Sequence, residues 1–139
     1  IILAAGRSSR MGAFKPLLPF GQKTVIRTCI DNMRSGGVQN VVVVASEGLR
    51  SAELKAHLKD IDVTLVNNPD PDSEMSASIG YGVLAVPKTT KAVIIIPVDH
   101  AAVPGAVVSS LVRAWNQGAR LVKPIVAERG GGALSSRPR

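Results

Sequence analysis

Short runs of apolar, largely β-branched residues recur along the chain, and segments of helical period lie between them. Runs that are apolar at every position are typical of strands covered on both faces, and their alternation with helices is typical of a parallel sheet. The predicted strands are residues 1–4, 40–46, 63–67 and 92–98. The predicted helices are residues 24–36, 51–59, 76–86 and 105–117. We therefore expect an α/β fold with a mostly parallel sheet.

A fifth apolar run, RLVKPIVA at residues 120–127, is a further strand candidate. Pro124 cannot donate a ladder hydrogen bond, which favours an edge position or a bend. The tail that follows is rich in Gly, Ser and Pro, and we expect it to be irregular. With 139 residues, 45% hydrophobic content and no internal repeat, the chain is expected to form a single domain over residues 1–139.

Several features bear on where the protein acts. The longest apolar runs fall far short of the roughly 20 residues that a membrane-spanning helix needs. Cys29 is the single cysteine and cannot form an internal disulfide. The start of the chain lacks the charged region and cleavage site of a signal peptide, although it begins without Met and residues before it are expected to be missing. We expect a cytoplasmic protein.

The formal net charge of +7 raises the question of nucleic-acid binding, because Lys and Arg neutralise phosphates. Aromatic residues make up only 3% of the chain, which leaves few rings on which bases could stack. The basic residues gather near the front and near the end of the sequence. The composition therefore argues against a nucleic-acid-binding protein.

The predicted topology indicates where a ligand would bind. Right-handed crossovers place the loop after each parallel strand at the carboxyl edge of the sheet, where open α/β folds bind ligands. The loops expected at that edge are residues 5–22, 46–50, 68–75 and 97–104. Most of the unusual chemistry of the sequence lies in them.

The first of these loops contains LAAGRSSRMGAFK, residues 3–15. It matches neither of the standard phosphate-binding patterns, GxxxxGK[ST] and GxGxxG. Gly6 nevertheless lets the backbone approach a ligand, its small neighbours leave space, and Arg10 and Lys15 can converge on an anion. We interpret the loop as a polyphosphate site. The alternative is that these are surface cations on an ordinary turn.

An aspartate and two histidines are the remaining candidates for metal or acid–base chemistry. Asp99 directly follows the run AVIIIPV, so a strand would deliver its carboxylate to the carboxyl edge. Because Mg²⁺ prefers few carboxylates together with substrate phosphate oxygens, we predict that Asp99 is its ligand. The alternative is that Asp99 caps the following helix or belongs to an ordinary loop turn. His100 is a weaker candidate for orienting an acceptor or a metal, and His57 is expected at the surface.

The segment SEMSASIGYG places small hydroxyl residues at the start of a predicted helix. Free backbone N–H groups and the helix dipole suit an anion or a polar base edge at such a position. Ser76 and Ser78 are therefore predicted to contact a nucleotide. The alternative is an ordinary serine N-cap.

Several spaced elements together resemble the MobA-like NTP transferase family of the molybdenum cofactor cytidylyltransferase and guanylyltransferase type. Residues 3–15 followed by PLLPFGQKTVI are similar to the signature LAAGxSxRMGxxK, and GGVQNVVVVAS, NPDPDSEMSASIGYG and IIIPVDHAAV follow in the family's order. The resemblance covers most of the chain. It implies a Rossmann-like, three-layer α/β/α sandwich of the nucleotide-diphospho-sugar transferase type. It also implies Mg²⁺-dependent transfer of a nucleotidyl group from an NTP, with release of pyrophosphate.

The resemblance also assigns roles to residues. Arg10 and Lys15 would hold the β- and γ-phosphates, and Asp99 would hold the metal. The backbone facing the base and ribose would be that of Leu3, Ala4, Ala5 and Gly6. Within the family LAAG resembles the cytidylyltransferase members, which favours CTP over GTP, and the expected acceptor is molybdopterin or another phosphorylated small molecule.

Two departures from the family pattern keep alternatives open. Glu74 stands where the family usually has Gly, which puts a bulky anion near the site. Family members usually continue past this length, so we expect a domain truncated at its C-terminal end. A sugar-phosphate nucleotidyltransferase and a nucleotide-binding module without turnover remain alternatives. Each of these functions involves a bound nucleotide. Each therefore requires that the glycine-bearing turn and Asp99 line one cleft.

Overall fold

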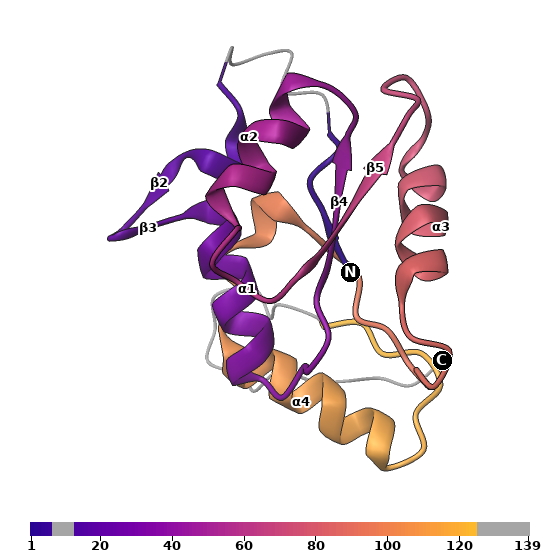
Figure 1. The fold of residues 1–139 in the computed structure, drawn as a ribbon. Helices are drawn as coiled ribbons and strands as arrows, with labels where there is room; N and C mark the ends of the chain where they lie inside the picture. The colour runs from indigo at the N-terminus through magenta and orange to yellow at the C-terminus, as the bar shows by residue number, and fades with distance from the viewer. Residues whose placement is uncertain (7–12, 125–139) are drawn as a thin grey trace.

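The computed structural model of the chain describes residues 1–6 and 13–124. Its centre is a sheet of four parallel strands with helices on both faces (Figure 1). The order across the sheet is β5-β4-β1-β6. The bounds are Ile2–Leu3 for β1, Val42–Ser46 for β4, Thr64–Asn68 for β5 and Ile96–Pro97 for β6. The predicted α/β fold with a parallel sheet is confirmed.

The four predicted helices are all present, each within two residues of its predicted bounds. They are α1 (Val25–Ser35), α2 (Leu49–His57), α3 (Met75–Ala85) and α4 (Gly105–Asn116). Within residues 1–6 and 13–124, no helix is both long enough and apolar enough to cross a membrane.

Alternating side chains of the strands pack on opposite faces of the sheet, which explains why the runs are apolar at every position. Ile2 and Val43 belong to the larger core, which includes Ile30 of α1, Leu54 of α2 and Val108 of α4. The smaller core on the other face consists of Ile1, Leu3, Val42 and Val44, against which α3 packs Ile79. The architecture is therefore the three-layer α/β/α sandwich that was predicted (Figure 1).

Glycines permit two close helix contacts. A Cβ added at Gly82 of α3 would lie 2.6 Å from Ile1 Cγ2, and one added at Gly36 would lie 2.4 Å from Val108 Cβ. The first contact joins α3 to the sheet, and the second joins the end of α1 to α4. Both distances are too short for a side chain, so glycine allows the layers to approach.

The prediction for residues 92–98 is wrong in part. The regular strand is limited to β6, and the chain turns into a short 3₁₀ helix, η2 (Val98–His100), directly after it. The N–H of Ile1 still donates to Ile94 O at 2.7 Å, so some pairing precedes β6. Val93 and Ile95 are about 40% exposed rather than covered on both faces, because β6 lies at the edge of the described sheet.

Two further predictions need correction. Residues 120–124 form no strand, and the rest of the predicted fifth strand and the tail lie outside the described residues. The predicted loop 5–22 contains regular structure, namely η1 (Lys15–Leu17) and an antiparallel hairpin of β2 (Pro19–Phe20) and β3 (Lys23–Thr24) that projects from the body in Figure 1. The hairpin turn includes Gly21 at a φ of 63°, a conformation that suits glycine.

Candidate functional site

A cleft of about 690 Å³ lies at the carboxyl ends of the strands. We call it the carboxyl-edge cleft. Four segments line it. They are residues 3–6 at the end of β1 and after it, Lys15 and Pro16 of η1, residues 71–73 with Met75 and Ser78 of α3, and residues 97–99 at the end of β6 and after it. Its volume lies within the range of small-molecule sites. The glycine-bearing turn and Asp99 therefore do line one cleft.

Lys15 and Asp99 are the charged pair at the centre of this arrangement. Lys15 Nζ lies 3.9 Å from Asp99 Oδ2, and both side chains are about half exposed. η1 begins at Lys15 and buries Pro16, while η2 places Asp99 next to the buried Val98. Two short 3₁₀ helices, each with one buried residue, thus present one cation and one carboxylate to the cleft.

The backbone between β1 and Gly6 is fixed by hydrogen bonds to β4. Ala4 N donates to Val44 O at 2.7 Å, and the Ser46 hydroxyl donates to Ala5 O at 2.8 Å. No atom of the described residues lies within 4 Å of the position that a Cβ on Gly6 would take. The turn is therefore anchored at its base and leaves room beside Gly6 for a ligand.

Asn68, at the end of β5, organises another part of the lining. Its side chain is almost fully buried. Its Nδ2 donates to Ser73 Oγ at 2.8 Å and to Ser78 Oγ at 2.9 Å, and its Oδ1 accepts from Asp70 N at 3.0 Å. The loop from Asp70 to Ser73 is thereby folded around the Asn68 amide.

The serines of α3 are placed differently from one another. Ser78 is buried and lines the carboxyl-edge cleft, whereas Ser76 is exposed and lies outside its lining. The alternative that either serine caps the helix is wrong, because both lie inside α3 and its N-cap is the exposed Glu74.

The other candidates are placed as follows. Asp99 is not the cap of α4, whose N-cap is Pro104. His100 is exposed and is not part of the cleft lining. Arg10, the second predicted phosphate ligand, lies outside the described residues.

Asp72, Ser73 and Asn68 were not predicted to belong to the site. Asp70 and Asp72 have the composition of an ordinary turn, yet Asp72 and Ser73 line the cleft. The Asn-Pro pair at residues 68 and 69 marks the end of a strand in the sequence. That signal places Asn68 at the right edge of the sheet, but its hydrogen-bond partners depend on how α3 packs.

The described residues offer few groups to a metal or to a covalent mechanism. Within residues 1–6 and 13–124 there is no group of three or more His, Cys, Asp or Glu side chains that could hold a metal ion. Burial, and to a lesser degree the negative charge of Asp99, raises the pKa of the Cys29 thiol to about 11. Cys29 is therefore protonated near neutral pH and is a poor nucleophile.

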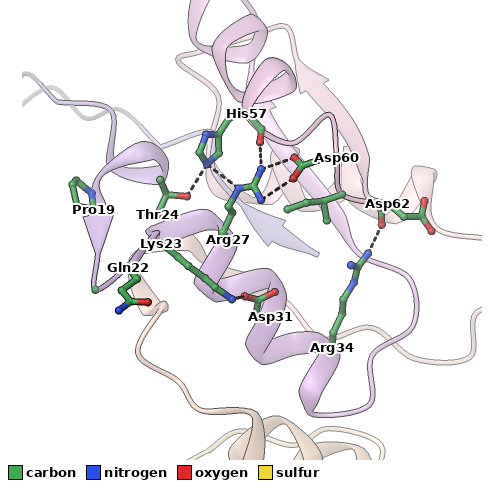
Figure 2. A pocket seen from close by; sticks show the side chains of 12 residues that line it. Pro19, Gln22, Lys23, Thr24, Arg27, Asp31, Arg34, His57, Asp60 and Asp62 are labelled. Atoms are coloured by element: carbon green, nitrogen blue, oxygen red, sulfur yellow. Dashed lines mark hydrogen bonds and ion pairs between the residues drawn. The ribbon is translucent and has the colours of Figure 1, made fainter.

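A second hollow, of about 800 Å³, lies between α1, the β2–β3 hairpin and the end of α2, and we call it the α1–α2 hollow. Figure 2 shows that Arg27 is its centre, with dashed contacts to His57 and Asp60. Arg27 Nε donates to His57 Nε2 at 3.2 Å, and Thr24 Oγ1 lies 2.8 Å from the same nitrogen. His57 was expected at the surface, but it is half-buried and hydrogen-bonded.

A comparison of the sequence with models of known families matches the MobA-like NTP transferase domain over residues 1–135. The chain belongs to the MobA-like NTP transferase family. A curated member, the molybdenum cofactor cytidylyltransferase of Escherichia coli (strain K12), is 36% identical over 87 residues, which is 62% of this chain and 44% of that protein. This MobA-like chain thus spans less than half the length of that curated relative.

Solved structures agree on the fold. A nucleotidyl transferase from Methanothermobacter thermautotroptrophicus superposes with a TM-score of 0.72 at 31% identity, over 81% of the MobA-like chain and 55% of the relative. The protein Rv0371c from Mycobacterium tuberculosis H37Rv gives a TM-score of 0.73 at 22% identity, over 84% and 58% of the two chains. A complex of that protein with manganese gives a TM-score of 0.64.

Proposed function

We propose that this chain is the nucleotide-binding domain of a Mg²⁺-dependent nucleotidyltransferase. It transfers a cytidylyl group from CTP to a phosphorylated small molecule such as molybdopterin, and releases pyrophosphate. The observation that carries the proposal is the carboxyl-edge cleft, in which Lys15 Nζ lies 3.9 Å from Asp99 Oδ2 beside the anchored turn of residues 3–6. Membership in the family supports the reaction class.

The cleft suggests how the nucleotide is bound. The Lys15 ammonium neutralises the β- and γ-phosphates, together with Arg10 by resemblance to the family signature. The backbone of Leu3, Ala4, Ala5 and Gly6 faces the base and ribose, where the open space at Gly6 admits them. The curated relative is named a cytidylyltransferase, which supports CTP over GTP.

Asp99 is the residue proposed to hold Mg²⁺. Its carboxylate is exposed to the cleft and stands opposite a lysine rather than a second acid at contact distance. Mg²⁺ is commonly held in nucleotide sites by one or two carboxylates, with waters and substrate phosphates as the remaining ligands. The donor set therefore fits Mg²⁺, which when bound polarises the phosphate oxygens. The manganese complex of the mycobacterial protein with the same fold is in keeping with a divalent ion.

The transfer needs little acid–base help from the protein. An oxygen of the acceptor phosphate attacks the α-phosphorus in line, and a new P–O bond forms as the bond to pyrophosphate breaks. Pyrophosphate leaves with the bonding electron pair, and the Lys15 charge stabilises it. Because the acceptor phosphate is already ionised near neutral pH, the proposal requires no general base. The task of the chain is to position two anions.

The direct test is pyrophosphate release from CTP or GTP in the presence of Mg²⁺ and molybdopterin. The expected result is release that depends on both the metal and the acceptor, faster with CTP than with GTP. Release with a sugar 1-phosphate in place of molybdopterin would favour the sugar-phosphate nucleotidyltransferase instead. Nucleotide binding without release from any acceptor would indicate a binding module.

A further inference from the structure

The buried amide of Asn68 is oriented without ambiguity. A backbone N–H can only donate, and Asp70 N lies 3.0 Å from one end of the amide, so that end is the oxygen. The other end is therefore the NH₂ group, and it faces Ser73 Oγ and Ser78 Oγ. Both serine oxygens must accept a hydrogen bond from Asn68.

The hydroxyl hydrogens of Ser73 and Ser78 differ in whether they already have an acceptor. Ser73 donates its hydrogen to Asp70 O at 2.7 Å, so both directions of its hydrogen bonding are used. Among the hydrogen bonds of residues 1–6 and 13–124, Ser78 Oγ takes part only in the one that it accepts from Asn68 Nδ2, so its hydrogen has no acceptor there. Ser78 is 6% exposed and is one of the residues that line the carboxyl-edge cleft. The hydrogen that Asn68 leaves free is therefore available to a ligand there.

We propose that Asn68 is a positioning residue that makes Ser78 a hydrogen-bond donor toward the nucleoside in the cleft. Asn68 does not line the cleft, and acts through Ser78 and the loop that its amide holds. The group recognised is an acceptor atom of the nucleoside, which is a carbonyl or ring nitrogen of the base or a ribose oxygen. The inference rests on the proposed nucleotide site, but not on turnover.

Asn68→Asp is the sharpest variant because it keeps the shape and the acceptor for Asp70 N while it removes both donors. The Ser78 hydroxyl then donates to the new carboxylate and presents a lone pair to the cleft, so the hydrogen bond to the ligand is lost. Ser78→Ala removes the same bond without adding charge. Asn67→Asp is the matched control, since it adds the same charge one residue away, where Asn67 Oδ1 accepts from Ser51 Oγ.

The affinities for CTP, GTP and tripolyphosphate are measured by calorimetry with Mg²⁺. The readout is a ratio: the affinity for whichever nucleotide binds more tightly, divided by the affinity for tripolyphosphate. An added negative charge opposes both anions and so cancels in this ratio. Loss of one hydrogen bond should lower the ratio about tenfold in Asn68→Asp and in Ser78→Ala. The double variant should lose no more than either alone, because both remove the same interaction. Asn67→Asp should leave the ratio unchanged.

Different results overturn different claims. An unchanged ratio in Ser78→Ala would refute the donor role even if Asn68→Asp failed to fold. Additive losses in the double variant would show that Asn68 does not act through Ser78. A wild-type ratio near one would mean that the nucleoside is not recognised, which also overturns the inference. If pyrophosphate release were absent while the ratio behaved as expected, the transferase function would fail and the Asn68 inference would stand. Comparison of the ribonucleotide with its 2′-deoxy form separates a ribose contact from a base contact.

Discussion

Lys15 and Asp99 form an exposed ion pair, and such pairs contribute little to folding stability. The two charges are therefore better explained by what they bind than by what they hold together. In the proposed site the lysine faces phosphates and the aspartate faces a metal ion, so substrate would replace their mutual contact. Substitution of either residue should then leave the fold intact and change the chemistry.

Asp99→Asn is expected to lower kcat for pyrophosphate release by at least about a hundredfold, because the amide is a much weaker ligand for Mg²⁺. Thermal unfolding should be unchanged, since the side chain is exposed. Asp62→Asn, an exposed acid in the α1–α2 hollow, is the matched control and should keep full activity. Normal turnover in Asp99→Asn would remove this residue from the metal site.

Lys15→Met keeps the apolar stem and removes the ammonium group. The expected result is a rise in the KM for CTP of about tenfold, because a charge-assisted contact with phosphate is lost. Binding of cytidine, which has no phosphate, should be unaffected. Lys55→Met, at an exposed position of α2, provides the comparison and should behave as wild type. An equal loss of cytidine binding would argue for a structural role of Lys15.

Arg27 also forms an ion pair, but unlike Lys15 and Asp99 it connects three segments of the chain. Besides His57 Nε2, its guanidinium donates to His57 O at 2.6 Å and to Asp60 Oδ2 at 3.1 Å. This contact lowers the pKa of Asp60 below its ordinary value of 3.8 and raises that of Arg27. Arg27 therefore acts as a brace between α1 and the end of α2, and its own charge is already paired with Asp60.

Arg27→Met should lower Tm by about 2–5 °C at pH 7. A folded-state carboxyl pKa below the unfolded value contributes stability above the unfolded pKa, and that contribution is lost as the pH falls through the folded value. The Tm difference between variant and wild type should therefore shrink below about pH 3.8. Lys23→Met, which breaks the exposed pair with Asp31, should change Tm much less. A Tm difference that persisted undiminished in acid would contradict the role of Asp60.

At the scale of elements, the packing of α3 on the sheet depends on one glycine. Gly82→Ala would place a methyl group 2.6 Å from Ile1 Cγ2 and 3.1 Å from Val44 Cγ2. Overpacking of this kind costs about 1–3 kcal/mol and exceeds the gain in helix propensity of about 1 kcal/mol. We expect a net loss in the free energy of unfolding, measured by urea denaturation.

Gly80 provides the matched control on the same helix. In the part of the chain that the structure describes, nothing lies within 4 Å of a Cβ added at Gly80, and the residue is exposed. Gly80→Ala should therefore stabilise the protein by up to about 1 kcal/mol through helix propensity alone. Stabilisation by both variants would show that α3 does not pack as closely on β1 and β4 as the structure has it.

The same elements show what the sequence could predict. The buried positions of α1, Ile26, Cys29, Ile30 and Met33, recur with helical spacing, so the helix was predictable from period alone. Each strand of the η1–β2–β3 segment has only two residues, which is too short for any period. Val93 and Ile95 belong to a run that is apolar throughout, but their exposure follows from the position of β6 at the edge of the described sheet, which depends on strand order.

The candidate site was predictable to a similar extent. Lys15 and Asp99 lie in the segments that follow β1 and β6, and the rule that such segments meet at the carboxyl edge is enough to place them in one cleft. The role of Asn68 could not be predicted, because its partner Ser78 lies ten residues further on another element. The position of Ser76 outside the cleft could not be predicted either, because it depends on how α3 is rotated about its own axis.

At the scale of the whole molecule, the formal net charge of +7 suits the proposed substrates, which are polyanions. A positive field raises the rate of encounter with anions, and added salt screens it. We expect kcat/KM for CTP to fall about threefold or more between 50 and 500 mM NaCl, while kcat changes little. Tm recorded over the same range serves as the control for unfolding.

The same experiment separates a nucleotide enzyme from a nucleic-acid-binding protein. Duplex DNA is bound through many phosphates at once, and its affinity falls far more steeply with salt than that of a single nucleotide. If the charge serves CTP, duplex DNA added at 50 mM NaCl should inhibit turnover only weakly. Strong inhibition with a steep salt slope would mean that the basic surface is built for a polymer, which the low aromatic content argues against.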